Sequence, residues 1–531
     1  MTITTETLDR FQMLGQDIGE LLARQADRRA DHPALVWSPS SGEERRWTYA
    51  ELWADVQSLA AGLAARGIGV GDRVLVHSEN CPEMVISSLA CSTAGATSVT
   101  TNTKSVEAEV TYFAEHTRAV AAITQPQFAA LVAAAAPELQ WIAVTADNSG
   151  EAPPPDQLDH DFVAFDELAT AAEDWTGRPA DPMLPSSIMF TSGTTSRPKA
   201  VVHTHANAIW ASRSGPRSID LGPDDTYLIY LPFFHVNALN WSLFAVLGVG
   251  ATAVMMPKWS QSRFWPVVTD HRVTHLSVMP FVMGALASPD RPTDHALRVG
   301  VFGFVSPQMD QMLGISVYGA FGMTETVTHC VSAKPYEHLA DRAMGRAVPG
   351  YEVAVVDQDS GELCDDGQPG ELWVRGTRGI QLFLEYDSNP EANDKAFSED
   401  WFKTGDIVRA TSAGELIYLE RDKDLLKVGG ENVSAREVED VAGAHDAVRQ
   451  AAVVGAPDDF LSEVPVAFVI LNPGDHDHDA VAAEIIASCE QRLASFKVPR
   501  RVHVVEAFPT GTLDKILKNR LRDLAAELAT T

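Results

Sequence analysis

The chain has 531 residues, of which 45% are hydrophobic and 21% are charged, a composition typical of a folded globular protein rather than of a chain that is disordered throughout. Asp and Glu outnumber Lys and Arg by 72 to 41, so the formal net charge is −31. A field of this sign disfavours nucleic acid and anionic membranes as partners, although a small anion can still bind at a locally basic site.

The cysteines and the apolar segments indicate a cytoplasmic protein. The five cysteines are scattered and include no CxxC pair, which argues against disulfides and zinc ribbons and favours a reducing compartment. The N-terminus lacks a basic start followed by an apolar core. The most apolar run, residues 243–257, is shorter than the ~20 residues of a membrane span, so we predict a buried helix followed by a strand there.

In chain order, strand-like runs alternate with helical patterns, which predicts α/β layers. Thr48 and Glu51 have the spacing of a capping box and predict a helix that stops near Gly67, with a strand at residues 73–76 after it. Further strands are predicted at residues 275–279, 297–302 and 371–375.

A smaller C-terminal unit is predicted to begin near residues 421–424. Its first helix is amphipathic and starts at Ser434 as the N-cap, with Glu437 at the third helical position. Two strands are predicted after it, at residues 451–454 and 464–471.

Residues 191–199, with the sequence TSGTTSRPK, carry the strongest chemical signal. Short hydroxyl donors, a glycine and one lysine are what a phosphate chain needs around it. The spacing from Gly193 to Lys199 mimics the GxxxxGK loop of nucleotide hydrolases, but Pro198 replaces the second glycine and Ala200 replaces the magnesium-binding Ser or Thr. The segment therefore predicts a different phosphate loop, with a polar surface turn as the alternative when the segment is taken alone.

This segment and its continuation, TSGTTSRPKAVVHTHAN, resemble the signature loop of the adenylate-forming superfamily of acyl-CoA synthetases, peptide-synthetase adenylation domains and luciferases. Six further blocks, spread with the signature loop over nearly the whole chain, resemble the family's other motifs in the family's order. They are LPFFH at 231–235, FGMTE at 321–325, GELWVRG at 370–376, TGD at 404–406, ERDKD at 420–424 with VGGEN at 428–432, and KILK at 515–518.

The resemblance implies an α/β fold with two parts. A large N-terminal domain, residues 1–420, would include a distorted β-barrel subdomain, and a small mobile α+β lid, residues 421–531, would be joined to it near Lys423. The implied reaction is ATP-dependent activation of a carboxylic acid to acyl-AMP, followed by transfer to CoA.

The resemblance also implies which residues bind ATP and Mg²⁺. Glu325 would bind Mg²⁺, Thr324 would hydrogen-bond the α-phosphate, and Lys515 would bridge the acid's carboxylate and the α-phosphate in the transition state. Phe321 would stack on adenine and Asp406 would accept both ribose hydroxyls. The full set expected to bind ATP or AMP is Thr191, Ser192, Gly193, Thr194, Thr195, Lys199, Phe321, Gly322, Thr324, Asp406, Arg421 and Lys515.

The acid pocket is expected to be short. Trp241 and Phe304 are bulky, which favours a short, branched or aromatic acid over a long fatty acid, and the blocks look nearest to those of carnitine/crotonobetaine-type and aryl-CoA ligases. The segment from 303 to 321 is several residues shorter than in the family, so the pocket wall is expected to be reshaped. The residues expected to line this pocket are His235, Asn237, Trp241, Met279, Phe281, Gly303 and Phe304.

For CoA, the resemblance implies a second conformation in which Lys515 leaves and the loop with Gly429 and Gly430 arrives to form the pantetheine tunnel. Lys258 is a candidate ligand of the CoA phosphates. The alternative acceptors are a carrier-protein thiol, an amine or another small nucleophile. A catalytically inactive nucleotide-binding regulator is the alternative outside enzymes, and a homodimer or a carrier protein in trans is left open.

Two groups of histidines could suggest a metal site. The run DHDHD at 475–479 lies in a Gly-Pro loop, where alternating side chains are expected to face solvent. His203 and His205 fall in the family's signature block just before a helix start. Neither group is predicted to bind a metal.

Overall fold

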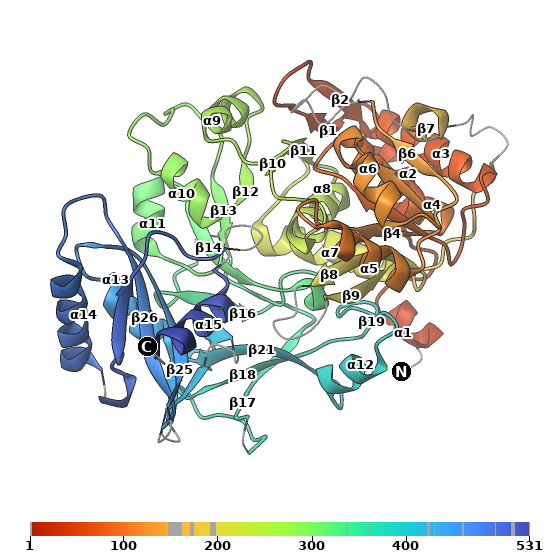
Figure 1. The fold of residues 1–531 in the computed structure, drawn as a ribbon. Helices are drawn as coiled ribbons and strands as arrows, with labels where there is room; N and C mark the ends of the chain where they lie inside the picture. The colour runs from red at the N-terminus through yellow and green to blue at the C-terminus, as the bar shows by residue number, and fades with distance from the viewer. Residues whose placement is uncertain are drawn as a thin grey trace. The chain divides into compact units, whose positions relative to one another are not determined.

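A computed structural model describes residues 3–146, 162–169, 175–191, 198–335, 337–358, 360–421, 425–428, 431–458, 461–493, 495–510 and 516–529 (Figure 1). The chain divides into two compact units, Met1–Val353 with Val374–Phe402, and Ala354–Trp373 with Lys403–Thr531. Residues 403–420, which the resemblance assigns to the N-terminal domain, group with the C-terminal part, and a hinge near Lys423 stays a prediction because residues 422–424 lie outside the described ranges. None of the helices in those ranges combines the length and apolar character that a bilayer crossing requires.

The first unit contains an eight-stranded sheet with the order β19-β9-β8-β4-β3-β5-β6-β7. Its strands from β8 to β7 are parallel, whereas β8, β9 and β19 pair antiparallel. The strands are β3 (Arg73–His77), β4 (Thr97–Thr100), β5 (Ala121–Thr124), β6 (Ile142–Val144), β7 (Val163–Ala164), β8 (Pro185–Thr191), β9 (Lys199–Thr204) and β19 (Glu385–Tyr386). The helices that follow or precede them are α3 (Tyr49–Ala65), α4 (Pro82–Ala94), α5 (Glu107–Thr117) and α6 (Pro126–Ala135).

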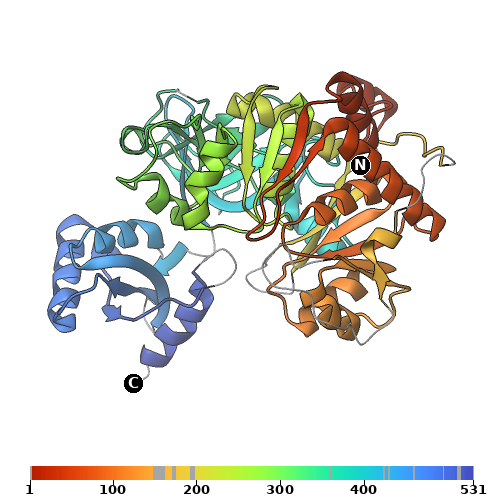
Figure 2. The same ribbon diagram turned by 90° about the horizontal axis from the view of Figure 1, so that it is seen from above.

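A second sheet of this unit has the order β16-β15-β14-β13-β12-β10-β11-β1-β2. Six neighbouring strands of this sheet, β14, β13, β12, β10, β11 and β1, are parallel and lie side by side in Figure 2. The carboxyl ends of parallel strands meet at one edge of a sheet, which is where open α/β sheets bind ligands. The strands are β1 (Pro33–Trp37), β2 (Arg45–Thr48), β10 (Thr226–Ile229), β11 (Thr252–Met255), β12 (His275–Ser277), β13 (Val299–Phe302), β14 (Ser316–Phe321), β15 (Val331–Ser332) and β16 (Ala343–Ala347). The accompanying helices are α1 (Thr5–Arg10), α2 (Ile18–Arg28), α7 (His205–Ile219), the π-helix η3 (Asn237–Leu243), α8 (Phe244–Val249), α9 (Gln261–Asp270), α10 (Pro280–Leu286), α11 (Pro307–Leu313) and the 3₁₀ turn η4 (Thr324–Thr326).

The local sequence signals are confirmed in this unit. Thr48 Oγ1 accepts from the backbone N–H of Glu51 at 3.2 Å, and the Glu51 carboxylate accepts from that of Thr48 at 2.8 Å, so the capping box starts α3. The apolar run at 243–257 forms α8 and then β11. The strand predicted at 275–279 is shorter, because Pro280 begins α10 and Met279 is the helix N-cap.

The second unit contains strands from two sheets. In one sheet, the strands β17 (Glu352–Val356), β18 (Pro369–Arg375), β21 (Trp401–Ala410) and β22 (Leu416–Arg421) are neighbours in that order, and most of their residues belong to this unit. The short strand β20 (Phe397–Ser398), which pairs with the first residues of β21, belongs to the first unit. The other sheet has the order β24-β23-β26-β25 with β27 beside β26. Its strands are β23 (Leu425–Val428), β24 (Glu431–Ser434), β25 (Val448–Asp458), β26 (Ser462–Leu471) and β27 (Arg501–Val504).

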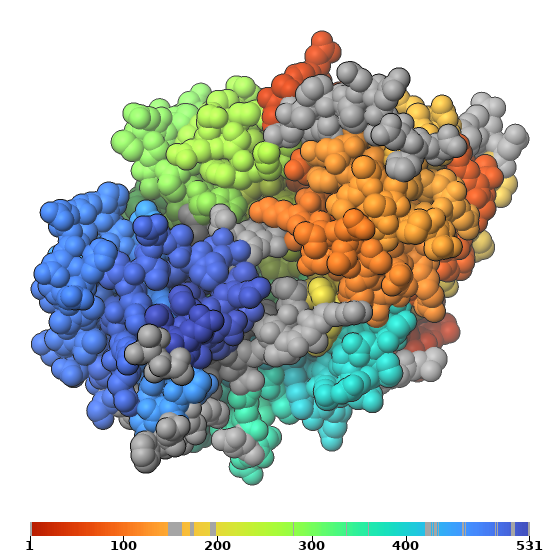
Figure 3. Space-filling view, viewed as in Figure 1, coloured from red at the N-terminus to blue at the C-terminus, as the bar shows by residue number. Residues whose placement is uncertain are grey.

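Helices cover both faces of this last sheet, as the blue ribbons of Figure 2 show. α13 (Ala435–Gly443) and α14 (His478–Arg492) pack on one face around Val453, whereas α15 (Lys518–Ala529) packs on the other face around Ala452 and Val454. Alternate residues of β25 therefore enter two cores, as strand geometry requires. The helix predicted at Ser434 and both predicted strands are confirmed, and these residues form the compact blue body in the space-filling view (Figure 3).

The histidine groups have structural roles. Asp477 is the N-cap of α14 and accepts from the backbone N–H groups of Asp479 and Ala480. His203 and His205 are buried, and His205 Nδ1 accepts from the backbone N–H of Ile18 at 3.2 Å. Within the described ranges, no three His, Cys, Asp or Glu side chains gather as a metal site.

Five buried histidines make the stability of the protein depend on pH. Burial lowers the pKa of His77, His203, His275 and His329 to about 4 and that of His205 to about 3. Between these values and the ordinary pKa of 6.5, the unfolded chain binds protons that the folded chain does not, so stability falls as the pH drops below 6.5. One unit below 6.5, each such histidine costs about 1.4 kcal/mol.

We therefore expect the urea midpoint of unfolding to be clearly lower at pH 5.5 than at pH 7.5. The control is the interval from pH 7.5 to 8.5, where these side chains are neutral in both states and the midpoint should stay constant. Equal midpoints at pH 5.5 and 7.5 would contradict the neutral, buried state of these rings.

Candidate active site

The predicted phosphate loop begins and ends on two paired strands. Thr191 at the end of β8 and Lys199 at the start of β9 are cross-strand partners, so the two ends of this run lie side by side. Residues 192–197, which include the predicted ligands Ser192, Gly193, Thr194 and Thr195, lie outside the described residues.

Tyr386, which the sequence motifs did not point to, links Lys199 to Glu325. β19 pairs with β9, with Tyr386 opposite Val201, and this pairing brings the phenol to the start of the signature strand. Lys199 Nζ lies 4.5 Å from the centre of the Tyr386 ring, and the Tyr386 hydroxyl donates to Oε1 of Glu325 at 2.9 Å. Burial and the neighbouring carboxylate of Glu325 raise the pKa of Tyr386 above its usual 10, so the phenol stays protonated and remains a donor.

His203 makes a second link between β9 and the FGMTE segment. Its Nε2–H donates to the backbone carbonyl of Thr324 at 2.7 Å. Because a carbonyl only accepts, the proton is on Nε2, and Nδ1 faces the amide nitrogen of Asn240 at 3.4 Å. Asn240 also donates to the carbonyl of Val327 at 3.1 Å, so one buried network holds both ends of the turn that carries Glu325.

The backbone after Glu325 is strained. Val327 has φ +66° and ψ −53°, and the N–H of Thr328 donates to the carbonyl of Thr326 at 2.6 Å, which defines a γ-turn with positive φ. Such a conformation in a β-branched residue persists only where the surroundings hold it, and such residues gather at functional sites. The hydroxyl of Tyr351 donates to the same carbonyl of Thr326 at 2.8 Å and so helps to hold the turn.

Glu325, Thr324 and Thr191 have the chemistry that a magnesium ion requires. Glu325 is a carboxylate with only 4% of its surface exposed, and the two threonines supply hydroxyl oxygens. Mg²⁺ prefers oxygen ligands and is usually held by one or two carboxylates together with substrate phosphates rather than by an all-protein cage. A single buried carboxylate beside a phosphate loop therefore fits this ion.

In the second unit, Asp406 and Arg421 lie at paired positions of two neighbouring strands. They are cross-strand partners in the β21–β22 pair, and Asp406 is only 2% exposed. The Tyr418 hydroxyl donates to Asp406 Oδ1 at 3.4 Å. Gly405 turns the chain before Asp406 with φ +70°, and its N–H donates to the Glu371 carboxylate at 2.9 Å.

The other predicted residues of the C-terminal part are not described. Lys515, Gly429 and Gly430 lie outside the described ranges, and their roles stay predictions.

All seven residues expected in the acid pocket follow the carboxyl ends of three neighbouring parallel strands. His235, Asn237 and Trp241 come after β10, Met279 and Phe281 after β12, and Gly303 and Phe304 after β13. This strand order places the three segments at one edge of the sheet.

Two of these side chains are already engaged within the protein. The amide oxygen of Asn237 accepts from the Ser277 hydroxyl at 2.8 Å, so its Nδ2 hydrogens are the part left for a substrate. Phe281 packs against Trp259 and Tyr230, with ring centroids 5.6 and 6.2 Å away, and these rings form an aromatic wall.

Trp241, His235 and the additional histidine His329 carry buried polar atoms. Trp241 and His329 are in edge contact, with centroids 4.5 Å apart. The indole N–H of Trp241, Nε2 of His235 and both ring nitrogens of His329 are buried without a hydrogen-bond partner among the described residues. Burial lowers the pKa of His235 and of His329 to about 4, so both rings are neutral near pH 7.

Gly322 shows why Trp241 lies against the FGMTE segment. A Cβ on Gly322 would lie 2.7 Å from the carbonyl oxygen of Thr328 and 2.8 Å from the Trp241 ring. Only glycine therefore permits this close approach.

The remaining predicted residues are Gly303, Phe304 and Lys258, of which Gly303 and Lys258 are exposed and Phe304 is partly buried. Gly303 is exposed, and nothing lies within 4 Å of a Cβ built on it. The Phe304 ring contacts Phe302 at 4.9 Å and the guanidinium of Arg342 at 5.7 Å, rather than the Trp241 and His329 rings. Lys258 is exposed after β11.

Comparison with known proteins finds similar sequences over nearly the whole chain. Residues 22–386 match the model of the AMP-binding enzyme family, and residues 437–515 match that of the AMP-binding enzyme C-terminal domain. A crotonobetaine/carnitine–CoA ligase from Citrobacter koseri is 30% identical over 522 residues, which cover 96% of this chain and 99% of that protein.

Solved structures of similar proteins have the same fold. The anthranilate-CoA ligase AuaEII in complex with anthranoyl-AMP is 25% identical with a TM-score of 0.85, and covers 98% of this chain and 99% of its own. The o-succinylbenzoate-CoA synthetase MenE from Bacillus subtilis, in complex with ATP and a magnesium ion, is 27% identical with a TM-score of 0.81, and covers 95% of this chain and 99% of its own.

The chain belongs to the AMP-binding enzyme family. It is an AMP-forming acid–CoA ligase, which activates a carboxylic acid through an acyl-adenylate.

Proposed function

We propose that this ligase activates a compact carboxylic acid that carries a second hydrogen-bonding group, such as a hydroxyl, keto or amino group. The observation behind the proposal is the set of buried polar atoms on His235, Trp241 and His329 that have no partner among the described residues. A buried donor or acceptor without a partner costs about 1–3 kcal/mol, so a ligand that supplies partners gains that much at each atom.

The neutral state of the two histidines narrows the substrate further. A neutral imidazole presents one donor and one acceptor, and the Trp241 indole presents a donor. Such groups suit an uncharged hydroxyl, carbonyl or amine better than a second carboxylate, which would need cations around it. The contact of Trp241 with Gly322 and the Phe281–Trp259–Tyr230 wall favour a compact acid.

In the adenylation step we assign the residues as follows. Lys199, Thr191 and the loop between them would hold the β- and γ-phosphates, and Glu325 would hold Mg²⁺, which would supply positive charge to the phosphates. Thr324 binds the α-phosphate, and Phe321 contacts adenine. These cations and donors offset the repulsion between the acid's carboxylate and the α-phosphate as the bond between them forms and pyrophosphate leaves.

The rest of the assignment follows the family resemblance. Asp406 and Arg421 bind the ribose, Lys515 stabilises the transition state, and Lys258 with Gly429 and Gly430 serves CoA. A cytoplasmic location belongs to the same proposal.

An acid panel measured by pyrophosphate release, with and without CoA, tests the proposed substrate class. Matched pairs isolate the polar group: 3-hydroxybutyrate against butyrate, carnitine against 4-(trimethylammonio)butyrate, and 2-aminobenzoate against benzoate. We expect kcat/KM to be at least about 10-fold higher for the polar member of the best pair, since sites built around hydrogen bonds reject analogues that lack them. A preference for the unsubstituted acids in every pair would reject the proposal.

Trp241→Phe tests the indole donor directly. The change removes one N–H and keeps an aromatic ring against Gly322, so the fold should persist. We expect the preference for the polar acid to shrink about 5- to 10-fold, mainly through KM, which corresponds to one lost hydrogen bond. Phe304→Leu is the control, because its ring contacts lie with Phe302 and Arg342, and it should leave the preference unchanged. An unaltered preference in Trp241→Phe would remove the indole from substrate recognition.

A further inference from the structure

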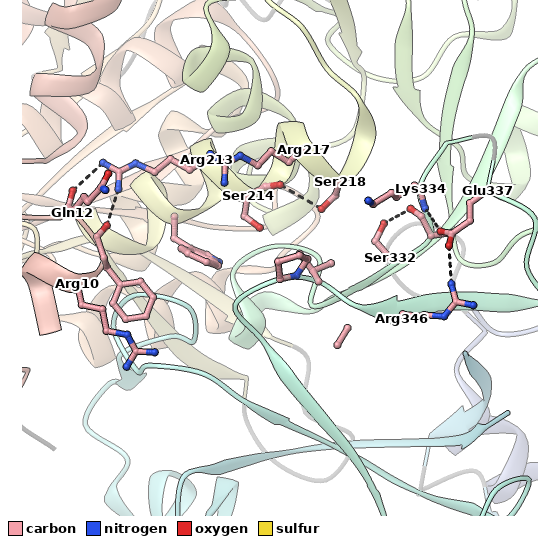
Figure 4. A pocket seen from close by; sticks show the side chains of 16 residues that line it. Arg10, Gln12, Arg213, Ser214, Arg217, Ser218, Ser332, Lys334, Glu337 and Arg346 are labelled. Atoms are coloured by element: carbon pink, nitrogen blue, oxygen red, sulfur yellow. Dashed lines mark hydrogen bonds and ion pairs between the residues drawn. The ribbon is translucent and has the colours of Figure 1, made fainter. Parts of the chain in front are cut away.

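A cavity of about 700 Å³ lies in the first unit (Figure 4). None of the residues that line it belongs to the predicted phosphate loop or to the predicted acid pocket. Its walls come from three segments far apart in the chain: the end of α1 and the turn after it, the second half of α7, and the strands β15 and β16 with the chain around them. The lining residues that carry the argument are Arg10, Arg213, Arg217, Lys334, Glu337 and Arg346.

Positive charge dominates this cavity. Five cationic side chains and one carboxylate line it, in a chain whose net charge is −31. Arg346 forms an ion pair with the carboxylate, Glu337, at 2.7 Å. Arg10, Arg217 and Lys334 have no ion pair within the part of the chain that the structure describes, and all three are exposed.

The cations are held close together. Arg213 donates to the backbone carbonyls of Phe11 at 2.9 Å and Gln12 at 3.1 Å, and so fastens the end of α1 to α7. Burial and the positive charges of Arg24 and Arg217 lower the pKa of Arg213. Like charges brought together in this way repel, and a bound anion would offset that repulsion.

The floor of the cavity is apolar and aromatic. The Phe11 and Trp210 rings meet edge to face with centroids 5.9 Å apart, and Val348 and Pro349 lie beside them. Trp210 Nε1 donates to the Tyr351 hydroxyl at 3.0 Å, which fixes the indole. Both aromatic residues are only half-buried, so part of their surface is available to a ligand.

We propose that this cavity is a second binding site, for a nucleoside phosphate. Guanidinium groups bind phosphate oxygens through paired N–H donors, and lysine adds a point charge. The half-buried aromatic rings suit the face or edge of a base. The volume lies within the range of small-molecule sites, and the combination of an apolar floor with a few placed charges is typical of them.

Calorimetric titration of the full chain with ADP tests the proposal. We expect two sites per chain, one at the phosphate loop and one at this cavity. Arg217→Glu and Lys334→Glu should each weaken the cavity site at least about 10-fold and leave the other site unchanged, whereas Asp406→Ala should weaken only the other site. Lys104→Glu is the matched control: it makes the same charge change at an exposed lysine that does not line the cavity, and it should keep both sites.

The outcomes separate this proposal from the assigned ATP site. A single ADP site that Arg217→Glu and Lys334→Glu both leave intact would overturn the cavity site. Pyrophosphate that binds the cavity as tightly as ADP would overturn the role of the aromatic floor. An Asp406→Ala variant that retains both sites would count against the assignment of Asp406 to the ribose and not against the cavity. Thermal unfolding of each variant confirms that a lost site does not reflect a lost fold.

Discussion

Replacing Glu325 by Gln should reduce adenylation at least about 10²-fold and raise the Mg²⁺ concentration needed for half-maximal rate. The substitution removes the charge that a hard cation prefers but keeps the shape of the side chain. The amide oxygen of Gln can still accept from the Tyr386 hydroxyl, which now meets Oε1 of Glu325 at 2.9 Å, so the buried turn should keep its structure. A 10²-fold loss corresponds to about 2.7 kcal/mol of transition-state stabilisation. Initial rates of pyrophosphate release over a Mg²⁺ series give both quantities.

Tyr386→Phe is the matched control for this experiment. It removes the hydrogen bond to Glu325 but leaves the carboxylate and the ring beneath Lys199 Nζ, 4.5 Å from the ring centre. Its activity should fall less than that of Glu325→Gln, because the carboxylate proposed to hold the metal is retained, and its Mg²⁺ requirement should stay near that of the unaltered enzyme. If Glu325→Gln retains the original Mg²⁺ dependence, Glu325 does not hold the metal.

Lys515→Ala should lower adenylation about 10²-fold or more and leave ATP binding nearly intact. The ammonium is proposed to neutralise charge that develops only in the transition state, and an interaction of that kind changes the rate rather than the ground-state affinity. Thioester formation from supplied acyl-AMP should survive, because the resemblance implies that Lys515 has left the site by then. The two half-reactions are measured separately, as pyrophosphate release without CoA and as thioester formation from the purified adenylate.

Lys518→Ala provides the comparison for Lys515→Ala. Lys518 belongs to the same lysine motif, but its Nζ forms an ion pair with Glu439 at 2.8 Å on α13, so its place is structural. We expect Lys518→Ala to keep both half-reactions close to normal while the variant is folded, with a clear loss of stability, because the carboxylate of Glu439 is buried and loses its partner. Equal loss of both half-reactions in Lys515→Ala would contradict the two-conformation account.

Local patterns in the sequence were enough to find the framework of the site. The capping box at Thr48 and Glu51, the helix at Ser434 and the strands around it depend on neighbouring residues, and the structure confirms them. The signature run was recognisable because its residues lie in a single stretch of chain, and its two ends, Thr191 and Lys199, are cross-strand partners. Motif order over the whole chain indicated the family, and the comparisons confirm it.

Only the tertiary structure revealed the contacts between residues remote in sequence. Tyr386 joins Lys199 and Glu325 because β19 pairs with β9, a pairing that no local spacing encodes. His203 on β9 donates to the Thr324 carbonyl in η4, and His329 contacts Trp241 of η3, although the residues of each pair are far apart in the sequence.

The cationic cavity, too, could not be predicted from the sequence. Arg10, Arg217 and Lys334 are unremarkable surface residues in the sequence, and their charges form one site only after α1, α7 and the segment after β15 are packed together. Helix and strand propensities depend on interactions between residues close in sequence. The cavity depends instead on which distant helices and strands pack next to one another. The sequence therefore determined the family, whereas the packing of distant segments determined which side chains lie together, because such contacts depend on elements that local spacing does not encode.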